Sequence, residues 1–196
     1  MIGDHKDNLL CVAARYGQIN TISFLFDEIR YNSHSKGRDG MSMLQLICHE
    51  RKLEVVEMLL TKYKLNVLLK GQSSSTDIRG ANGCSLLHLA SQLGHLELIE
   101  QLITDYNIDP MICDNKGNTP LHYTALSGRS EVAKLLIVKF RTPVNHQNNK
   151  CETPLHLACT EGHVAFIQTL SKEHKADINA RDINNHAPLQ RAALSG

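Results

Sequence analysis

The sequence predicts an all-α fold in which about six helix-turn-helix repeats stack into a solenoid. Three observations support this prediction. A leucine recurs at intervals of 34 residues with one exception, a glycine stands seven positions after that leucine in most repeats, and an amphipathic segment follows the glycine. Self-similarity at a fixed period of roughly 20 to 50 residues is typical of repeat architectures.

The recurring leucine sets the boundaries of the repeats. It stands at Leu10, Leu44, Leu87, Leu121, Leu155 and Leu189. The second interval is 43 residues and the other four are 34. We therefore expect one domain over residues 1–196, with repeats at approximately 3–36, 37–79, 80–113, 114–147 and 148–181 and an incomplete repeat at 182–196.

The first helix of a repeat is expected to begin at a threonine that is followed by proline. The pairs Thr119-Pro120 and Thr153-Pro154 show this pattern. A threonine hydroxyl can cap the helix, and proline lacks only an N–H that would have no partner at that position. Small residues such as Ala158 let neighbouring repeats approach closely. Glycine then suits the C-terminus of the helix, and it occurs at Gly17, Gly94, Gly128, Gly162 and Gly196.

The second helix of a repeat is expected to be amphipathic. In the third repeat its apolar residues are Leu96, Ile99, Leu102 and Ile103, at the three- and four-residue spacing of one helix face. Neither helix can bury its apolar stripe alone. Stacked repeats bury these stripes jointly, which predicts an elongated solenoid.

The repeated motifs resemble the ankyrin repeat family. The segments 117–122 and 152–158 contain Thr-Pro-Leu-His, and 85–95 ends in the Gly-His turn of that family. The resemblance covers essentially the whole chain. It implies β-hairpin-like fingers at the connections 109–114, 144–148 and 177–182. It also implies that the chain binds another protein on the concave surface formed by finger tips and inner helices, and that it is not an enzyme.

Several departures from the pattern locate the ends and the weak points of the stack. The first repeat lacks Thr-Pro, as expected for a terminal cap. Arg51 replaces the turn glycine of the second repeat, so we expect that turn to be the least secure. Because the sequence stops after the first helix of the sixth repeat, we expect a fragment of a longer protein.

The long second interval predicts an insertion near 68–79, centred on the Gly-, Ser- and Thr-rich segment 71–76. One interpretation is a specificity loop or a phosphorylation site, for example at Ser74, where phosphate would add charge. The other is an insertion tolerated in an exposed finger, since a longer loop costs little closure entropy.

Composition limits the partners and the compartment. With 21 Lys plus Arg against 20 Asp plus Glu, no strong field favours nucleic acid or an anionic membrane surface. The N-terminus does not resemble a secretory signal, and no stretch is long and apolar enough for direct membrane insertion. We expect a cytoplasmic monomer, with the nucleus possible as a second location, and six free cysteine thiols.

Histidines are numerous, with 11 in the chain, but their positions indicate a structural role. His88, His122 and His156 each follow the repeat leucine, so they are expected to bridge hydroxyl and backbone groups at a turn. The spacing from His156 through Cys159 to His163 would suit a metal on one helix face. His163, however, follows a glycine turn and is expected off that face. We therefore expect no metal, no cofactor and no catalytic residues.

The candidate binding surface consists of positions that vary between repeats while their neighbours stay constant. Such positions are free to serve a partner, and their side chains are expected on the surface. The predicted partner-binding residues are Asn82, Cys84, Gln92, Leu93, Asn115, Lys116, Asn118, Leu126, Ser127, Asn149, Lys150, Glu152, Thr160 and Glu161.

Two alternatives concern the biological role. The stack could be the recognition arm of a larger multidomain protein, such as a channel, a kinase, a ubiquitin ligase or a cytoskeletal adaptor. Its resemblance to the family also implies a possible role as substrate, because Asn145 and Asn179 resemble finger asparagines that asparagine hydroxylases modify.

Overall fold

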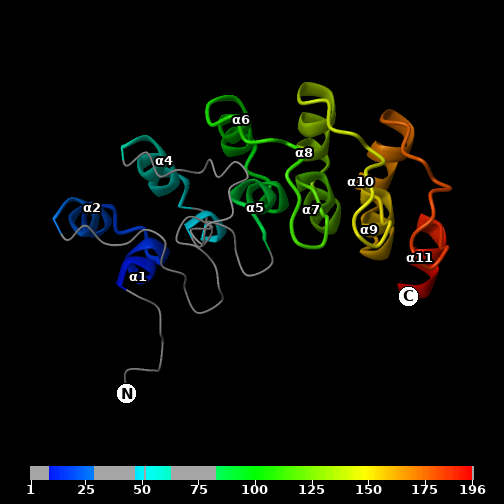
Figure 1. Ribbon diagram of the computed structural model, residues 1–196, viewed down its shortest axis with the longest axis horizontal. Coiled ribbons are helices and arrows are strands. Elements are labelled where there is room, and N and C mark those ends of the chain that lie inside the picture. Colours follow the sequence, from blue (N-terminus) through cyan, green and yellow to red (C-terminus); the bar gives the residue numbers. More distant parts are fainter. Residues whose placement is uncertain (1–8, 29–46, 51, 63–82, 196) are drawn as a thin grey trace, which may run out of the picture. The chain divides into compact units, whose positions relative to one another are not determined.

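A computed structural model describes residues 9–28, 47–50, 52–62 and 83–195 (Figure 1). These residues form helices joined by turns, and no strand occurs among them. The all-α prediction is therefore confirmed. The chain divides into two compact units, residues 1–86 and 87–196. The prediction of one domain with six repeats stays a prediction.

In the first unit, α1 (Leu9–Arg15) and α2 (Ile19–Asp27) form a helix pair. Gly17 separates them with a φ of +66°, the left-handed conformation expected of a glycine at this turn. Residues 47–49 are helical, and α4 (Leu53–Thr61) follows. Lys62 Nζ lies 2.9 Å from Asp27 Oδ2, which ties the end of α4 to the end of α2.

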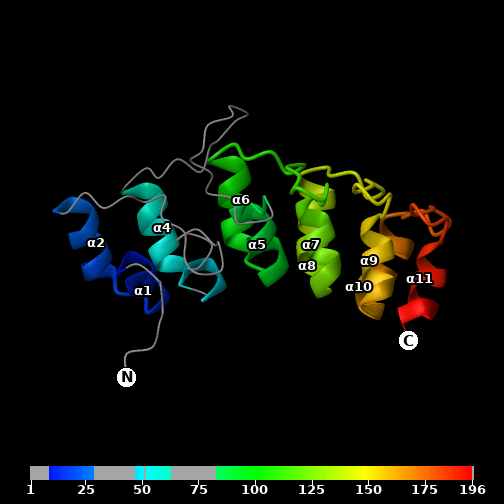
Figure 2. The same cartoon turned by 60° about the horizontal axis from the view of Figure 1, so that its bottom comes forward.

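The second unit contains the most regular repeats. Its helices are α5 (Leu86–Leu93), α6 (Leu96–Thr104), α7 (Pro120–Ser127), α8 (Ser130–Lys134), α9 (Pro154–Thr160), α10 (Val164–Gln168) and α11 (Pro188–Ser195). The π-helical segments η1 (Leu135–Lys139) and η2 (Thr169–Glu173) continue α8 and α10. Helices α7, α9 and α11 lie side by side (Figures 1 and 2).

The inner helices pack closely because their central residues are small. Ala90, Ala125 and Ala158 are completely buried, so no bulky side chain separates neighbouring repeats. The second helices contribute larger apolar groups, among them Ile99 and Leu136, which are also completely buried. The predicted division between small inner residues and an amphipathic second helix is confirmed in this unit.

The predicted caps are present at α7 and α9. Thr119 and Thr153 are the N-cap residues, each followed by proline at the first helical position. At the other end of α7, Gly128 takes a φ of +66° and acts as the C-cap. In α11 the threonine is replaced by Ala187, and Gln190 Oε1 accepts the Ala187 N–H at 2.8 Å. A glutamine thus supplies the backward half of a capping box.

Some predictions fall outside the described residues. These include the turn at Arg51 and the insertion near 68–79, with its segment 71–76. At the end of the chain, α11 forms as expected, and the side chains of Leu189 and Leu194 are exposed.

Candidate functional site

Each finger of the second unit begins with an aspartate or asparagine that closes the turn. Asp114 Oδ1 accepts the backbone N–H groups of Lys116 and Asn118, both at 2.8 Å. The Asp114 N–H in turn donates to the Asn118 carbonyl at 2.9 Å. The same bonds recur in the fingers that begin at Asn148 and Asp182. Turns of five residues therefore close the fingers at 114–118, 148–152 and 182–186, so each turn begins at the last residue of a connection predicted to form a finger (109–114, 144–148 and 177–182).

Neighbouring fingers are joined through their backbones. The Asn149 N–H donates to the Lys116 carbonyl at 3.0 Å, and the Ile183 N–H donates to the Lys150 carbonyl at 2.9 Å. Asn149 Nδ2 also donates to the Asn115 carbonyl at 3.2 Å. The loops that carry these bonds run along one side of the second unit (Figure 2). We call the set of bonds between fingers the finger ladder.

Histidines connect each inner helix to the next finger. The His122 ring accepts the Thr119 N–H at Nδ1 (3.1 Å), so its proton resides on Nε2, which donates to the Glu152 carbonyl at 3.1 Å. His156 Nδ1 likewise accepts the Thr153 N–H, and His88 Nε2 lies 2.9 Å from the Asn118 carbonyl. The predicted bridging role of these histidines is confirmed.

Burial keeps the His122 ring neutral. It lowers the pKa of His122 to about 4, because the imidazolium would lose its hydration; the positive charge of a protonated His146 nearby would lower it further. The hydrogen bond from Nε2 to the Glu152 carbonyl opposes this shift only in part. A protonated Nδ1 could no longer accept the Thr119 N–H, so the capping bond requires the neutral ring.

The fingers and inner helices of neighbouring repeats enclose a cavity of about 430 Å³, which we call the finger groove. Nine of the predicted partner-binding residues line it. They are Asn115, Lys116, Asn118, Leu126, Asn149, Lys150, Glu152, Thr160 and Glu161.

Other predicted residues do not line this cavity. Gln92, Leu93 and Ser127 are partly buried on or near the ends of α5 and α7. The Gln92 carbonyl accepts a hydrogen bond from Arg129 Nε at 3.3 Å. Cys84 belongs to the first unit and is partly buried, and Asn82 lies outside the described residues.

The expectation of surface side chains is wrong at Asn118 and Glu152, which are 8% and 6% exposed. Asn118 Oδ1 accepts a hydrogen bond from Asn148 Nδ2 at 2.8 Å, and the same amide donates to Glu152 Oε2 at 3.0 Å. Buried polar side chains need hydrogen-bond partners. Because these partners differ from one finger to the next, the residue types at these positions also vary between repeats. Asn118 and Glu152 both line the finger groove although their side chains are largely buried.

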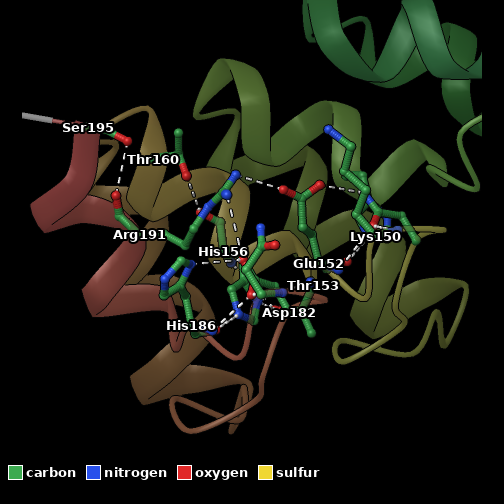
Figure 3. Close-up of polar contacts among 12 residues, drawn as sticks. Lys150, Glu152, Thr153, His156, Thr160, Asp182, His186, Arg191 and Ser195 are labelled. Atoms are coloured by element: carbon green, nitrogen blue, oxygen red, sulfur yellow. Dashed lines mark hydrogen bonds and ion pairs between the residues drawn. The ribbon is translucent and has the colours of Figure 1, made fainter.

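Arg191 is a groove residue that the sequence reasoning missed. It projects from α11 and places Nη2 2.7 Å from Glu152 Oε1 (Figure 3). Its position, two residues after the repeat leucine, holds Leu89, Tyr123 and Leu157 in the preceding repeats. Variation at that position was the available signal. At the equivalent position, Tyr123 also contacts a carboxylate of a finger, since its hydroxyl donates to Asp114 Oδ2 at 3.0 Å.

Asp182 completes the charged cluster under the last finger. Its Oδ2 lies 3.6 Å from Arg191 Nη1 and 3.7 Å from His186 Nδ1 (Figure 3). Burial would raise the pKa of the Asp182 carboxyl. Backbone N–H groups of His186 and Asn184, together with the charges of His186 and Arg191, lower it overall. The carboxylate therefore stays ionised opposite Arg191.

The remaining candidates are metal ligands, cysteines, membrane-spanning helices and the asparagines that could be hydroxylated. Within residues 9–28, 47–50, 52–62 and 83–195, no three His, Cys, Asp or Glu side chains are grouped as they would be around a metal ion. Among the five cysteines whose side chains the structure describes, none is in a disulfide. The helices of this part of the chain are too short and polar to span a membrane. Asn145 and Asn179 are both exposed, and modification there stays a prediction.

Comparison with known families agrees with the repeat geometry. A model of ankyrin repeats in three copies matches residues 62–144, and a model of ankyrin repeats in many copies matches residues 137–192. No curated protein matches the chain. The caps, fingers and bridging histidines occur within the matched residues. The chain therefore belongs to the ankyrin repeat family.

Proposed function

We propose that this chain is a non-catalytic adaptor that binds a segment of a partner protein in the finger groove. Ankyrin repeats are in general protein–protein interaction modules and are typically not catalytic. The observation that carries the proposal is the cavity of about 430 Å³ between fingers and inner helices, which gathers most of the predicted partner-binding residues.

The composition of the groove suits a protein ligand. Leu126 and Leu157 provide apolar contact, and the exposed Asn115, Lys116 and Lys150 provide polar groups around it. Binding sites commonly combine an apolar surface with a few well-placed polar groups. The finger ladder fixes the backbone of the fingers that carry these polar groups before a partner binds, which reduces the conformational entropy lost on binding.

A substitution that fills the groove without changing charge tests the proposal. Thr160 lies at the end of α9, is partly buried, lines the groove, and its hydroxyl donates to the His156 carbonyl at 3.0 Å. Ser171 is the matched control. It is also partly buried, and its hydroxyl donates to the Ile167 carbonyl at 2.7 Å, but it belongs to η2 and does not line the groove.

The experiment is a quantitative pull-down from cell lysate with the parent chain, Thr160→Trp and Ser171→Trp, each shown to be folded by circular dichroism. We expect Thr160→Trp to lose proteins that the parent and Ser171→Trp retain. Equal retention by all three chains would contradict the proposal and would place any binding elsewhere on the surface.

A further inference from the structure

We propose that the finger groove selects an acidic segment of its partner, an extended stretch whose Asp and Glu carboxylates reach Lys116 and Lys150. This inference rests on the proposed function and adds the chemical class of the ligand. It follows from three features of the groove, which are its unpaired cations, the fixed register of the two fingers, and the distance between neighbouring repeats.

Some charged side chains of the groove form an ion pair and others do not. Its charged residues are Lys116, Lys150, Arg191, Glu152 and Glu161. Arg191 is held by Glu152 at 2.7 Å, so these two charges compensate each other. In the part of the chain that the structure describes, no ion pair involves either lysine. The fingers therefore carry two exposed ammonium groups, whereas the groove contains one exposed carboxylate, that of Glu161 at the end of α9.

The finger ladder holds the two lysines in register. The Lys116 carbonyl accepts the Asn149 N–H at 3.0 Å, and the Lys150 carbonyl accepts the Ile183 N–H at 2.9 Å. The backbone carbonyls of both lysines are thus hydrogen-bonded to the next finger, while the lysine side chains remain exposed. A partner that bridges the two ammonium groups does not have to order the fingers first, so less conformational entropy is lost.

The spacing of the lysines favours an extended peptide. They occupy the same position in consecutive fingers, and the helices of neighbouring repeats pack about 8–10 Å apart. An extended chain advances about 3.3 Å per residue. Carboxylates two to four residues apart in the ligand therefore match the two lysines, with the acidic side of the segment against the fingers.

The test selects ligands from a random dodecapeptide phage library on the immobilised parent chain. The same selection is made on Lys116→Glu/Lys150→Glu and on a control, Lys172→Glu/Lys175→Glu, which carries the same net charge change at two exposed lysines away from the groove. We expect Asp and Glu to be enriched, two to four residues apart, in peptides from the parent and the control. Peptides from the groove variant should be enriched in Lys and Arg instead.

Affinities of the best parent-selected peptide then measure the effect by fluorescence anisotropy. One exposed ion pair changes affinity up to about fivefold, so reversal of both lysines should weaken binding by about tenfold or more. The control should stay within about twofold of the parent. Glu161→Gln should strengthen binding by about two- to fivefold, a gain that misfolding cannot imitate. Raising the salt concentration should weaken binding to the parent and abolish these differences.

The outcomes separate this inference from the proposed function. Peptides that lose binding in Thr160→Trp but show no acidic enrichment overturn the inference and leave the proposed function standing. Peptides that bind Thr160→Trp and the parent equally contradict both. A library from which no dodecapeptide is enriched also overturns the inference, because twelve extended residues are long enough to span both lysines.

Discussion

Gly117 and Gly162 offer a direct test of how rigidly the fingers stack. Both have a left-handed backbone, with φ of +76° and +71°. A Cβ added at Gly117 would lie 2.5 Å from Asn149 Oδ1 and 2.8 Å from the Asn149 backbone nitrogen, whereas a Cβ at Gly162 would meet nothing within 4 Å. The two alanine variants share the backbone strain and differ in the contact with the next finger.

The expected free energies follow from these surroundings. A left-handed alanine costs roughly 1–2 kcal/mol in the folded state, and alanine regains roughly 0.4–1 kcal/mol through the lower entropy of its unfolded chain. Gly162→Ala should therefore lower the free energy of unfolding by about 1 kcal/mol. Gly117→Ala adds an overpacking cost of roughly 1–3 kcal/mol. We expect it to be about 2 kcal/mol less stable than Gly162→Ala.

Urea unfolding followed by circular dichroism at 222 nm measures the difference. With a slope of about 2 kcal/mol per molar urea, the two midpoints should differ by about 1 M. Asn149→Ala combined with Gly117→Ala should recover part of the loss, since it removes the Oδ1 contact but leaves the backbone contact. Equal midpoints for Gly117→Ala and Gly162→Ala would refute the idea that the finger ladder is closely packed.

Three further predictions use the same unfolding assay. The pKa of His122 is about 4 in the folded chain and about 6.5 in the unfolded chain. The neutral His122 ring therefore contributes fully to the free energy of unfolding above pH 6.5, and this contribution is lost as the pH falls towards 4. Lowering the pH from 7 to 5 should cost about 2 kcal/mol, and His122→Gln should remove most of this dependence; an unchanged pH slope would contradict the assignment. Cys151 has a φ of +57° at the finger position where Gly117 stands, so Cys151→Gly should raise stability by roughly 0.5–1 kcal/mol, and a lower urea midpoint would argue against strain there. Arg191→Met leaves the buried Glu152 carboxylate without its cation and should cost roughly 2–3 kcal/mol; adding Glu152→Gln should restore part of it, and strictly additive losses would show that the pair is not coupled.

The fold could be predicted because each repeat restates the same local requirements. Thr119 and Thr153 cap their helices, and His122 and His156 accept the capping N–H, as their recurrence at one position of the repeat indicated. Gln190 shows the limit of that argument. It replaces the histidine in the last repeat and keeps the bond to the N-cap backbone, a chemical equivalence that identity alone does not reveal.

The candidate site could be predicted in outline but not in its polar interior. Variation between repeats located Lys116, Lys150 and Glu161, whose side chains are exposed along the groove. The same criterion included Asn118 and Glu152, because variation does not distinguish a side chain that faces a partner from one that pairs with a neighbouring finger. Arg191 reaches Glu152 across 39 residues, and only the stacking of the helices brings them together.

The finger ladder has a consequence for how this surface can change during evolution. Its bonds at Lys116 and Lys150 use backbone carbonyls, so the stack does not depend on which side chain stands at either position. Substitutions there alter the charge offered to a ligand while leaving the bonds between repeats intact. Binding specificity can therefore drift, or be redesigned, one finger at a time without a matching loss of fold stability.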